Sequence, residues 1–245
     1  MGKETFRIES GKISADSIRD PTIICGYQGT GLVGALVVNH LIEEMAFSEI
    51  GSSQLREVPP VIALRQGRMF KPMSVLYNKE KNLIVIFILA PTAGIEWEIA
   101  DTVETVSKNL KAKETIITDG ITINSKDPVY YLSNYCNSND CENLNKKIKP
   151  VKNSVVGGVT SALLMKDMKV LCFLGNLMGE ANNQEFLSPV KSAVNVLDVL
   201  NWYLKLRIDT SKLEKLGEQM EKELEKFIGR LEKMRQRPQE QSYIG

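Results

Sequence analysis

The chain has 245 residues, with 31 Lys and Arg against 30 Asp and Glu, one histidine and four cysteines. This length fits one large domain or one domain with an appendage, and it is enough to bury a core without disulfides or metals. A net charge of +1 gives no electrostatic indication of a nucleic-acid partner. Because neither a run of eighteen or more apolar residues nor an apolar N-terminal leader occurs, we expect a soluble, cytoplasmic protein without a membrane partner.

The first elements in chain order are a strand, a glycine-rich turn and a helix. Residues 22–26 form a short apolar run, which predicts a buried strand. Apolar side chains recur at helical spacing over 32–45, which predicts a helix. Between them, Gly29, Gly31 and Gly34 have the G-x-G-x-x-G spacing of a dinucleotide-binding turn, and they stand in the right place, after a strand and at the start of a helix.

This glycine turn has two interpretations. In a nucleotide site the glycines bring a pyrophosphate to the helix N-terminus, and Glu49, about 20 residues further on, would bind a ribose. In a structural role the glycines let the helix pack closely against its strand. The sequence after Gly51 favours the structural role, because it leads into hairpin-like segments instead of another helix and parallel strand. A P-loop is excluded, because no Gly-Lys-Ser/Thr occurs.

Strands and helices alternate through the rest of the chain. Short apolar segments predict strands at 61–64, 73–77 and 83–90, and the last is apolar on both faces, as in the centre of a sheet. The further predicted elements are a helix at 95–110, a strand at 115–118, a polar insertion at 124–149 with a short helix over 127–135, a short helix through 162–164, a strand at 169–174, and a helix that Ser188 caps ahead of Pro189. This order predicts an α/β domain with a mixed, largely parallel sheet that helices cover on both faces.

The C-terminal region is a predicted amphipathic helix of high charge. Ser211 and Glu214 have the spacing of a capping box, so we expect the helix to begin at Lys212. Its apolar stripe fits either a helix that lies on its own domain or a short coiled coil between protomers; the stripe consists of Leu213, Leu216, Met220, Leu224, Phe227, Leu231 and Met234. We therefore divide the chain into an α/β domain, 1–208, and a C-terminal helix with a flexible tail, 209–245.

The cysteines and the histidine do not form a recognisable catalytic or metal site. Cys25 and Cys172 lie in apolar runs typical of buried cysteine, whereas Cys136 and Cys141 flank a polar loop and are either bonded or free thiols. No further Cys or His pair accompanies them, so we expect no metal site. His40 lies in a predicted helix and no nucleophile turn occurs, so we expect a structural histidine, no catalytic residue and no enzyme activity.

Several of these segments together resemble the proteasome assembly chaperone family, whose archaeal members are related to the second eukaryotic assembly chaperone. The segment 24–35 with 38–41 is similar to the N-terminal signature of that family. The resemblance continues through 58–60, 83–91, Trp97, 157–164, 170–175, 206–209 and the charged helix beyond. It implies a phosphorylase/hydrolase-like three-layer α/β/α fold, no catalysis, no cofactor, homo-oligomers, and a role in binding 20S proteasome α-subunits during ring assembly.

The resemblance also draws attention to the last residues. Family chaperones that engage the proteasome often end in a hydrophobic-Tyr-X motif, whose aromatic ring and terminal carboxylate dock between α-subunits. Here Tyr243, Ile244 and Gly245 supply these groups, with the tyrosine third from the end instead of second. We assign partner binding to these three residues, and an inert terminus is the alternative. Because some members are described as ATP-grasp-like, the alternative function is a nucleotide-binding enzyme, ATP-grasp-like or dinucleotide-dependent, that uses the turn from Gly29 to Gly34.

Overall fold

The sheet at the centre of the molecule has four parallel strands in its middle. The structure is a computed structural model that describes residues 7–8, 17–53, 55, 60–65, 67–89, 92–136, 141–178 and 188–219, with only the backbone at 7–8, 65 and 68. In this part of the chain a nine-stranded sheet has the order β1-β3-β6-β7-β2-β8-β11-β9-β10. Its parallel centre consists of β7 (Leu83–Ile88), β2 (Thr22–Gly26), β8 (Glu114–Ile121) and β11 (Val170–Asn176).

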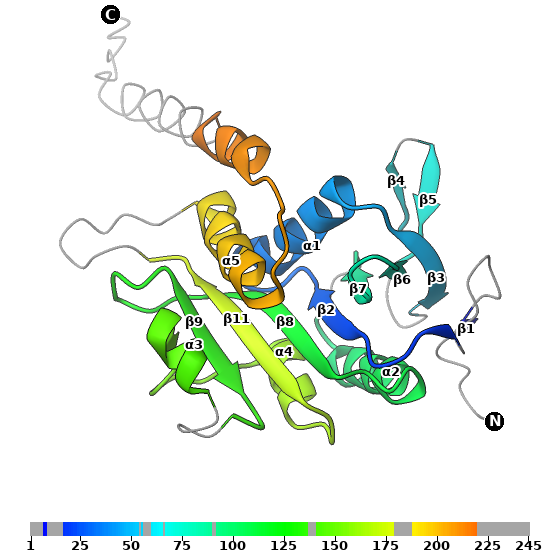
Figure 1. Ribbon diagram of the computed structural model, residues 1–245, viewed down its shortest axis with the longest axis horizontal. Helices are drawn as coiled ribbons and strands as arrows, with labels where there is room; N and C mark the ends of the chain where they lie inside the picture. The colour runs from blue at the N-terminus through cyan, green and yellow to red at the C-terminus, as the bar shows by residue number, and fades with distance from the viewer. Residues whose placement is uncertain are drawn as a thin grey trace, which may run out of the picture.

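Antiparallel strands flank this parallel centre on both sides. On one side β6 (Met73–Asn78), β3 (Ser48–Ser53) and β1 (Arg7–Ile8) follow one another in antiparallel pairs from β7 outward. On the other side β9 (Val129–Ser133) is antiparallel to β11, and β10 (Lys149–Pro150) is parallel to β9. A separate hairpin of β4 (Ala63–Arg65) and β5 (Arg68–Phe70) extends near β3 (Figure 1). The predicted mixed sheet is confirmed, with parallel pairing at its centre and mostly antiparallel pairing on either side.

Helices cover both faces of this sheet (Figure 1). On one face α1 (Val33–Glu44) follows the short 3-10 turn η2 (Thr30–Leu32) and packs with α5 (Pro189–Leu204) and α3 (Glu142–Lys147) in one apolar cluster. On the other face α2 (Glu96–Asn109) and α4 (Gly158–Leu164) share a second cluster. Ser188 caps α5 as predicted, since its hydroxyl accepts a hydrogen bond from the Lys191 N–H at 3.2 Å. The three-layer α/β/α fold is therefore confirmed.

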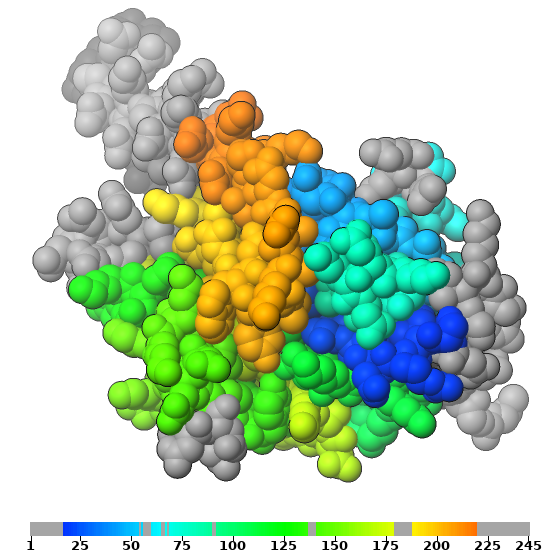
Figure 2. All heavy atoms as spheres, viewed as in Figure 1, coloured from blue at the N-terminus to red at the C-terminus, as the bar shows by residue number. Residues whose placement is uncertain are grey.

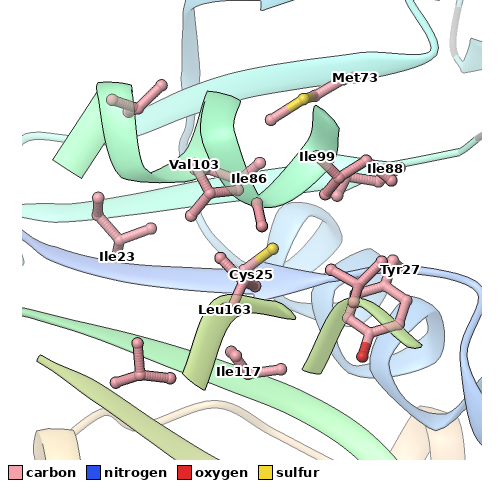
Figure 3. Close-up of a cluster of buried hydrophobic side chains, with 14 of the residues drawn as sticks. Ile23, Cys25, Tyr27, Met73, Ile86, Ile88, Ile99, Val103, Ile117 and Leu163 are labelled. Carbon is pink, nitrogen blue, oxygen red and sulfur yellow. The ribbon is translucent and has the colours of Figure 1, made fainter. Parts of the chain in front are cut away.

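The cluster under α2 and α4 shows why the apolar runs predicted these elements correctly. Figure 3 shows Cys25 of β2 among Ile86 of β7, Val103 of α2 and Leu163 of α4. All four side chains are completely buried. Burial raises the pKa of the Cys25 thiol to about 12, so this cysteine stays protonated and packs as a small apolar residue, as the sequence predicted.

One predicted element is wrong: residues 127–135 are not a short helix. They contain β9, which pairs with β11 from Val129 to Ser133. Tyr130 and Tyr131 are both buried, and they belong to the clusters on opposite faces of the sheet, which is the alternation of a strand. The polar residues around this segment suggested an exposed insertion, whereas the two tyrosines supply the apolar area that a strand near the sheet edge needs. The short helix of the region is α3, further along the chain.

The C-terminal helix is described from 211 to 219 and lies against α1 and α5 (Figure 2). Leu213 is buried, and Lys212 Nζ donates a hydrogen bond to Glu44 Oε1 at 2.7 Å. The predicted capping box is not formed, because the Ser211 N–H donates to the Asp209 carboxylate at 3.0 Å and the helix begins one residue earlier. The apolar stripe from Met220 onward lies outside the described residues, and the division at 208/209 stays a prediction. None of the described helices has the length and apolar character to cross a membrane.

Candidate functional site

The carboxyl ends of β2 and β8 bring the glycine turn next to a buried acidic residue, Asp119. This is the edge of the sheet at which α/β proteins commonly bind ligands. Asp119 lies near the end of β8, its side chain is 6% exposed, and it is the neighbour in space of the turn that follows β2. What this edge can bind therefore depends on the groups that surround the Asp119 carboxylate.

Four donors surround the Asp119 carboxylate. The N–H groups of Thr30 and Gly120 donate to Oδ1 at 2.9 and 2.7 Å. The hydroxyls of Tyr27 and Thr160 donate to Oδ2 at 2.7 and 2.9 Å, and these two hydroxyls also contact each other. Because Tyr27 follows β2, Asp119 lies on β8 and Thr160 lies on α4, the network ties these three elements and the glycine turn together.

The electrostatics of this network follow from its burial. Burial raises the pKa of Asp119, while the hydrogen bonds from Tyr27, Gly120, Thr160 and Thr30 oppose that shift because they favour the ionised form. Burial, and then the charge of Asp119, raises the pKa of Tyr27 well above its usual value. The phenol therefore keeps its proton and remains a hydrogen-bond donor, which is the role that it has in the network.

The structure brings Gly29, Gly31 and Gly34 together in one turn, and each of them has a geometric requirement. A Cβ at Gly29 would overlap the Asp119 carboxylate. A Cβ at Gly34 would overlap the backbone oxygen of Thr118, so α1 lies directly on β8 at this point. Gly31 has φ +63°, a left-handed conformation that favours glycine. Close packing and a sharp turn are the structural role that the sequence analysis weighed against a nucleotide site.

The groups that would bind a nucleotide are arranged differently from a dinucleotide site. The N–H of Thr30, at the start of the helical turn where a phosphate would bind, already donates to Asp119, and this carboxylate would repel a phosphate. Glu49 lies on β3, and β6 and β7 stand between β3 and β2. At about 4.8 Å between strands, Glu49 lies roughly 14 Å across the sheet from β2. The structure thus assembles the three glycines but does not bring Glu49 to them.

The histidine and the cysteines have structural contacts. His40 is buried, and its Nε2–H donates to the carbonyl oxygen of Asp209 at 2.7 Å, which holds α1 to the segment before the C-terminal helix. Cys136 and Cys141 are joined by a disulfide with a Cα–Cα distance of 5.7 Å, so the bonded alternative is the one found. In the described part of the chain, His, Cys, Asp and Glu side chains do not form a group of three or more that could hold a metal ion.

The residues assigned to partner binding, Tyr243, Ile244 and Gly245, lie outside the described residues, so that assignment stays a prediction. The feature that sequence reasoning missed is the role of Asp119. The signal was present, since an acidic residue stands at the carboxyl end of a predicted strand. Nothing in the sequence, however, indicated that the turn after β2 would bind this carboxylate through its own backbone.

A family profile, a sequence relative and two solved structures identify the family of this chain. The sequence profile of the PAC2 family matches residues 23–228. The Methanocaldococcus jannaschii protein MJ0106 is 23% identical over 224 residues, which cover 90% of this chain and 89% of that protein. The crystal structure of Pyrococcus furiosus PbaA, described as an archaeal homolog of proteasome-assembly chaperone, superposes with a TM-score of 0.70 at 24% identity and covers 89% of this chain and 96% of PbaA. Pyrococcus furiosus PbaB, described as an archaeal proteasome activator, has a TM-score of 0.68 at 18% identity and covers 91% of this chain and 98% of PbaB. A profile that spans most of the chain, on a fold shared over nearly the whole length of these structures, shows that this chain belongs to the PAC2 family.

Proposed function

We propose that this chain is a non-enzymatic proteasome assembly chaperone, or a related proteasome-binding factor, that engages 20S α-subunits as a homo-oligomer in the cytoplasm. The observation that carries the proposal is the PAC2 profile match over residues 23–228. The similarity in fold to PbaA and PbaB, whose descriptions refer to the proteasome, supports it.

The sheet edge at Asp119 supports the non-enzymatic part of the proposal. An enzyme of this architecture would use the carboxyl edge of the sheet to bind a substrate or cofactor. Here the turn after β2 binds a carboxylate of its own chain, and the hydroxyls of Tyr27 and Thr160 donate to that same carboxylate. These hydrogen bonds connect β2, β8 and α4 to one another. We therefore place the function at the outer surface, as contact with another protein.

Co-expression with archaeal α-subunits tests the proposal. The full chain and the α-subunits should co-elute in size-exclusion chromatography, and native mass spectrometry should give their ratio. The matched control is the same experiment with β-subunits in place of α-subunits, which should elute separately. If the full chain and a chain without its last three residues both elute apart from the α-subunits, the proposed function is wrong.

The tail contributes a separable part of the proposal. Tyr243 fills a pocket between α-subunits, and the carboxylate of Gly245 pairs with a basic group there, with Ile244 as the apolar residue between them. Tyr243→Ala should weaken α-subunit binding by about tenfold or more, since loss of a buried aromatic anchor at an interface removes at least about 1.4 kcal/mol. Ser242→Ala is the control and should bind as the full chain does. Equal binding by both variants would mean that the terminus is inert.

The proposal includes no cofactor, and thermal shift measurements address this directly. A nucleotide present at 100 times its dissociation constant would stabilise the folded protein by about 2.7 kcal/mol. We expect the melting temperature to stay constant with ATP, AMP, NAD and NADP. A shift of that size with any of these would favour the nucleotide-binding alternative.

A further inference from the structure

The disulfide between Cys136 and Cys141 joins the segment after β9 to the start of α3. The two cysteines are five positions apart in the sequence, and their Cα atoms are 5.7 Å apart. Cys141 directly precedes Glu142, the first residue of α3, and its side chain belongs to the apolar cluster that α3 shares with α1 and α5. The bond therefore fixes the amino end of α3 to the sheet.

Contacts other than the disulfide hold the Cys136 side of the bond. The N–H groups of Tyr135 and Cys136 donate to Ser133 Oγ of β9 at 3.2 and 3.3 Å. The Tyr135 hydroxyl donates to Glu114 Oε2 of β8 at 2.9 Å, and the Lys169 ammonium group lies 5.8 Å from the Tyr135 ring centroid. The segment that carries Cys136 is thus tied to β8 and β9 whether or not the disulfide is present.

The α3 side of the bond is shorter and more weakly supported by its own structure. This helix has six residues, fewer than an isolated helix needs to be stable in water. It is attached by the buried side chains of Leu144 and of Ile148, which follows it, and by a hydrogen bond from the Tyr131 hydroxyl to Asn145 Oδ1 at 2.7 Å. We therefore expect α3, and not β9, to change its order when the disulfide opens.

The two bonded cysteines differ in access. Cys136 is partly exposed, whereas Cys141 is 6% exposed, so a thiolate from outside reaches Cys136 first. Cys25 and Cys172 are completely buried, and burial raises the pKa of both thiols, which keeps them protonated and unreactive. Disulfides of cytosolic proteins are usually transient, with a catalytic or redox-sensing role. The position of this bond suits reduction without unfolding of the chain.

We propose that the Cys136–Cys141 disulfide is a redox-modification site, opened by a dithiol reductant, that controls the order of α3. The inference rests on the cytoplasmic location in the proposed function, and it is independent of the proteasome partner. It assigns Cys136 Sγ as the point of attack and α3 as the element that responds.

The reaction is an exchange of thiols and disulfides. One thiolate of the reductant bonds to Cys136 Sγ, the bond to Cys141 breaks, and Cys141 leaves as a thiolate that takes a proton from water. The second thiolate of the reductant then attacks the reductant's own sulfur in this mixed disulfide and releases Cys136, which is protonated in turn. The reductant loses two electrons and two protons and becomes a disulfide, and the protein gains them as two thiols.

Opening the bond loosens α3 and leaves the parallel centre of the sheet intact. The disulfide closes a ring of residues 136–141, and loss of this constraint should raise the population of detached α3 by roughly tenfold or more. Leu144 then leaves the cluster that it shares with Val129 and Tyr131 of β9, which exposes apolar surface at this side of the sheet.

Alkylation of the folded chain tests the assigned site. The full chain, purified without reductant, is treated with dithiothreitol and then with iodoacetamide, and mass spectrometry locates the labels. We expect labels at Cys136 and Cys141 and none at Cys25 or Cys172, with an unchanged circular dichroism spectrum. Without dithiothreitol we expect no label. The monothiol glutathione should form its mixed disulfide mainly on Cys136.

Hydrogen exchange measures the order of α3. Reduction should speed amide exchange over 142–147 by roughly tenfold or more, while exchange in β8 and β11 stays the same. Trypsin gives a second measurement, because Lys146 and Lys147 are exposed residues of α3. Cleavage at these two lysines should quicken on reduction, while cleavage at Lys191, an exposed residue of α5, should not.

Two variants separate the bond from the reagent. The double variant Cys136→Ser with Cys141→Ser should behave as the reduced chain does, with or without dithiothreitol. Asn143→Ser is the matched control, because Asn143 is an exposed residue of α3, and it should keep the full response of the wild type.

Any of five results would overturn the inference. They are label on the untreated chain, no label at Cys136 and Cys141 after dithiothreitol while the chain is folded, label on all four cysteines, a glutathione adduct mainly on Cys141, or equal exchange over 142–147 in the two states. Co-elution with α-subunits is measured separately and without reductant, so a failure of this inference is distinguishable from a failure of the proposed function.

Discussion

The carboxyl edge of the sheet and the β4–β5 hairpin make opposite use of their side chains. At the edge, Asp119 is buried and accepts hydrogen bonds from two N–H groups and two hydroxyls of its own chain. On the hairpin, Leu64 is 71% exposed although it is one of the most apolar residue types. The first region completes its interactions within the molecule, and the second leaves apolar side chains exposed to solvent.

This difference indicates which of the two regions contributes more to the stability of the fold. In an α/β enzyme the polar groups at the carboxyl edge are held ready for a ligand. Here the polar groups at the edge stabilise the fold, and apolar side chains stand on the periphery. Substitutions at the edge should therefore lower stability strongly, and substitutions at the exposed positions of the hairpin should change it little.

The largest expected effect is that of Asp119→Ala. This change leaves four donors at a buried position without their acceptor, which should lower the free energy of unfolding by about 3–4 kcal/mol. Urea unfolding followed by circular dichroism measures it. The control is Asp167→Ala, because Asp167 is exposed and its removal should change stability by less than about 0.5 kcal/mol. A loss at Asp119 no larger than at Asp167 would contradict the importance of the network.

The same carboxylate predicts a dependence of stability on pH. Burial raises the pKa of Asp119 in the folded protein, so between its unfolded and folded pKa values the native state binds more protons than the unfolded state. The contribution of Asp119 to stability therefore falls as pH rises through that window. Asp119→Asn removes this titration, so the stability advantage of the wild type over the variant should be larger at the acid end of the window than above it. A difference that grows with pH would show that the donors outweigh the burial.

Gly34→Ala should have the next largest effect. The added methyl group overlaps the backbone oxygen of Thr118, which cannot move without shifting β8, so we expect a loss of about 2–3 kcal/mol. Gly157→Ala is the matched control, because a Cβ there meets nothing within 4 Å and the loss should stay below about 1 kcal/mol. Similar losses at the two positions would mean that α1 does not need its close approach to β8.

A smaller effect is expected at a second buried carboxylate, that of Glu114 at the other end of β8. The hydroxyls of Tyr135 and Tyr203 both donate to its Oε2 at 2.9 Å. Tyr203→Phe removes one of the two and should lower the unfolding free energy by about 1–1.5 kcal/mol. Tyr131→Phe is the comparison, because the Tyr131 hydroxyl donates to the neutral amide of Asn145, and its loss should be smaller. The reverse order would contradict the importance of the Glu114 charge.

The smallest effect on stability is expected on the hairpin. Leu64→Glu should change the unfolding free energy by less than about 0.5 kcal/mol, because the side chain is exposed. Urea unfolding measures it, and a stability loss of several kcal/mol would remove the contrast between the two regions.

Sequence patterns predicted the central elements because those elements are apolar over their whole length. The segments at 22–26, 83–90 and 169–174 were located almost to the residue, and the glycine turn was placed correctly between β2 and α1. β3 was not recognised, because Ser48–Ser53 contains only one large apolar side chain and is buried by its position in the sheet. β9 was mistaken for a helix for a related reason, since its burial depends on tyrosines within a polar stretch.

The functional site was less predictable than the fold. The glycine spacing predicts a tight turn, and that prediction is confirmed, but the same spacing serves a nucleotide or an internal carboxylate equally well. Asp119 lies 85 residues after Gly34 in the sequence, and only the parallel pairing of β2 with β8 brings the two segments together. The exposed side chains of the hairpin were also beyond sequence reasoning, because the continuous apolar run at 61–64 does not reveal which side is covered.

The position of β2 has a consequence for how the chain folds during synthesis. This strand is made early, yet its two neighbours in the sheet are β7 and β8, which begin 61 and 92 residues later, at Leu83 and Glu114 against Thr22. At a translation rate of about 5–20 residues per second, β7 and β8 are synthesised roughly 3–18 seconds after β2. The parallel centre of the sheet therefore cannot be completed until β8 has been synthesised, and β2 is without both of its neighbouring strands until β7 has been made.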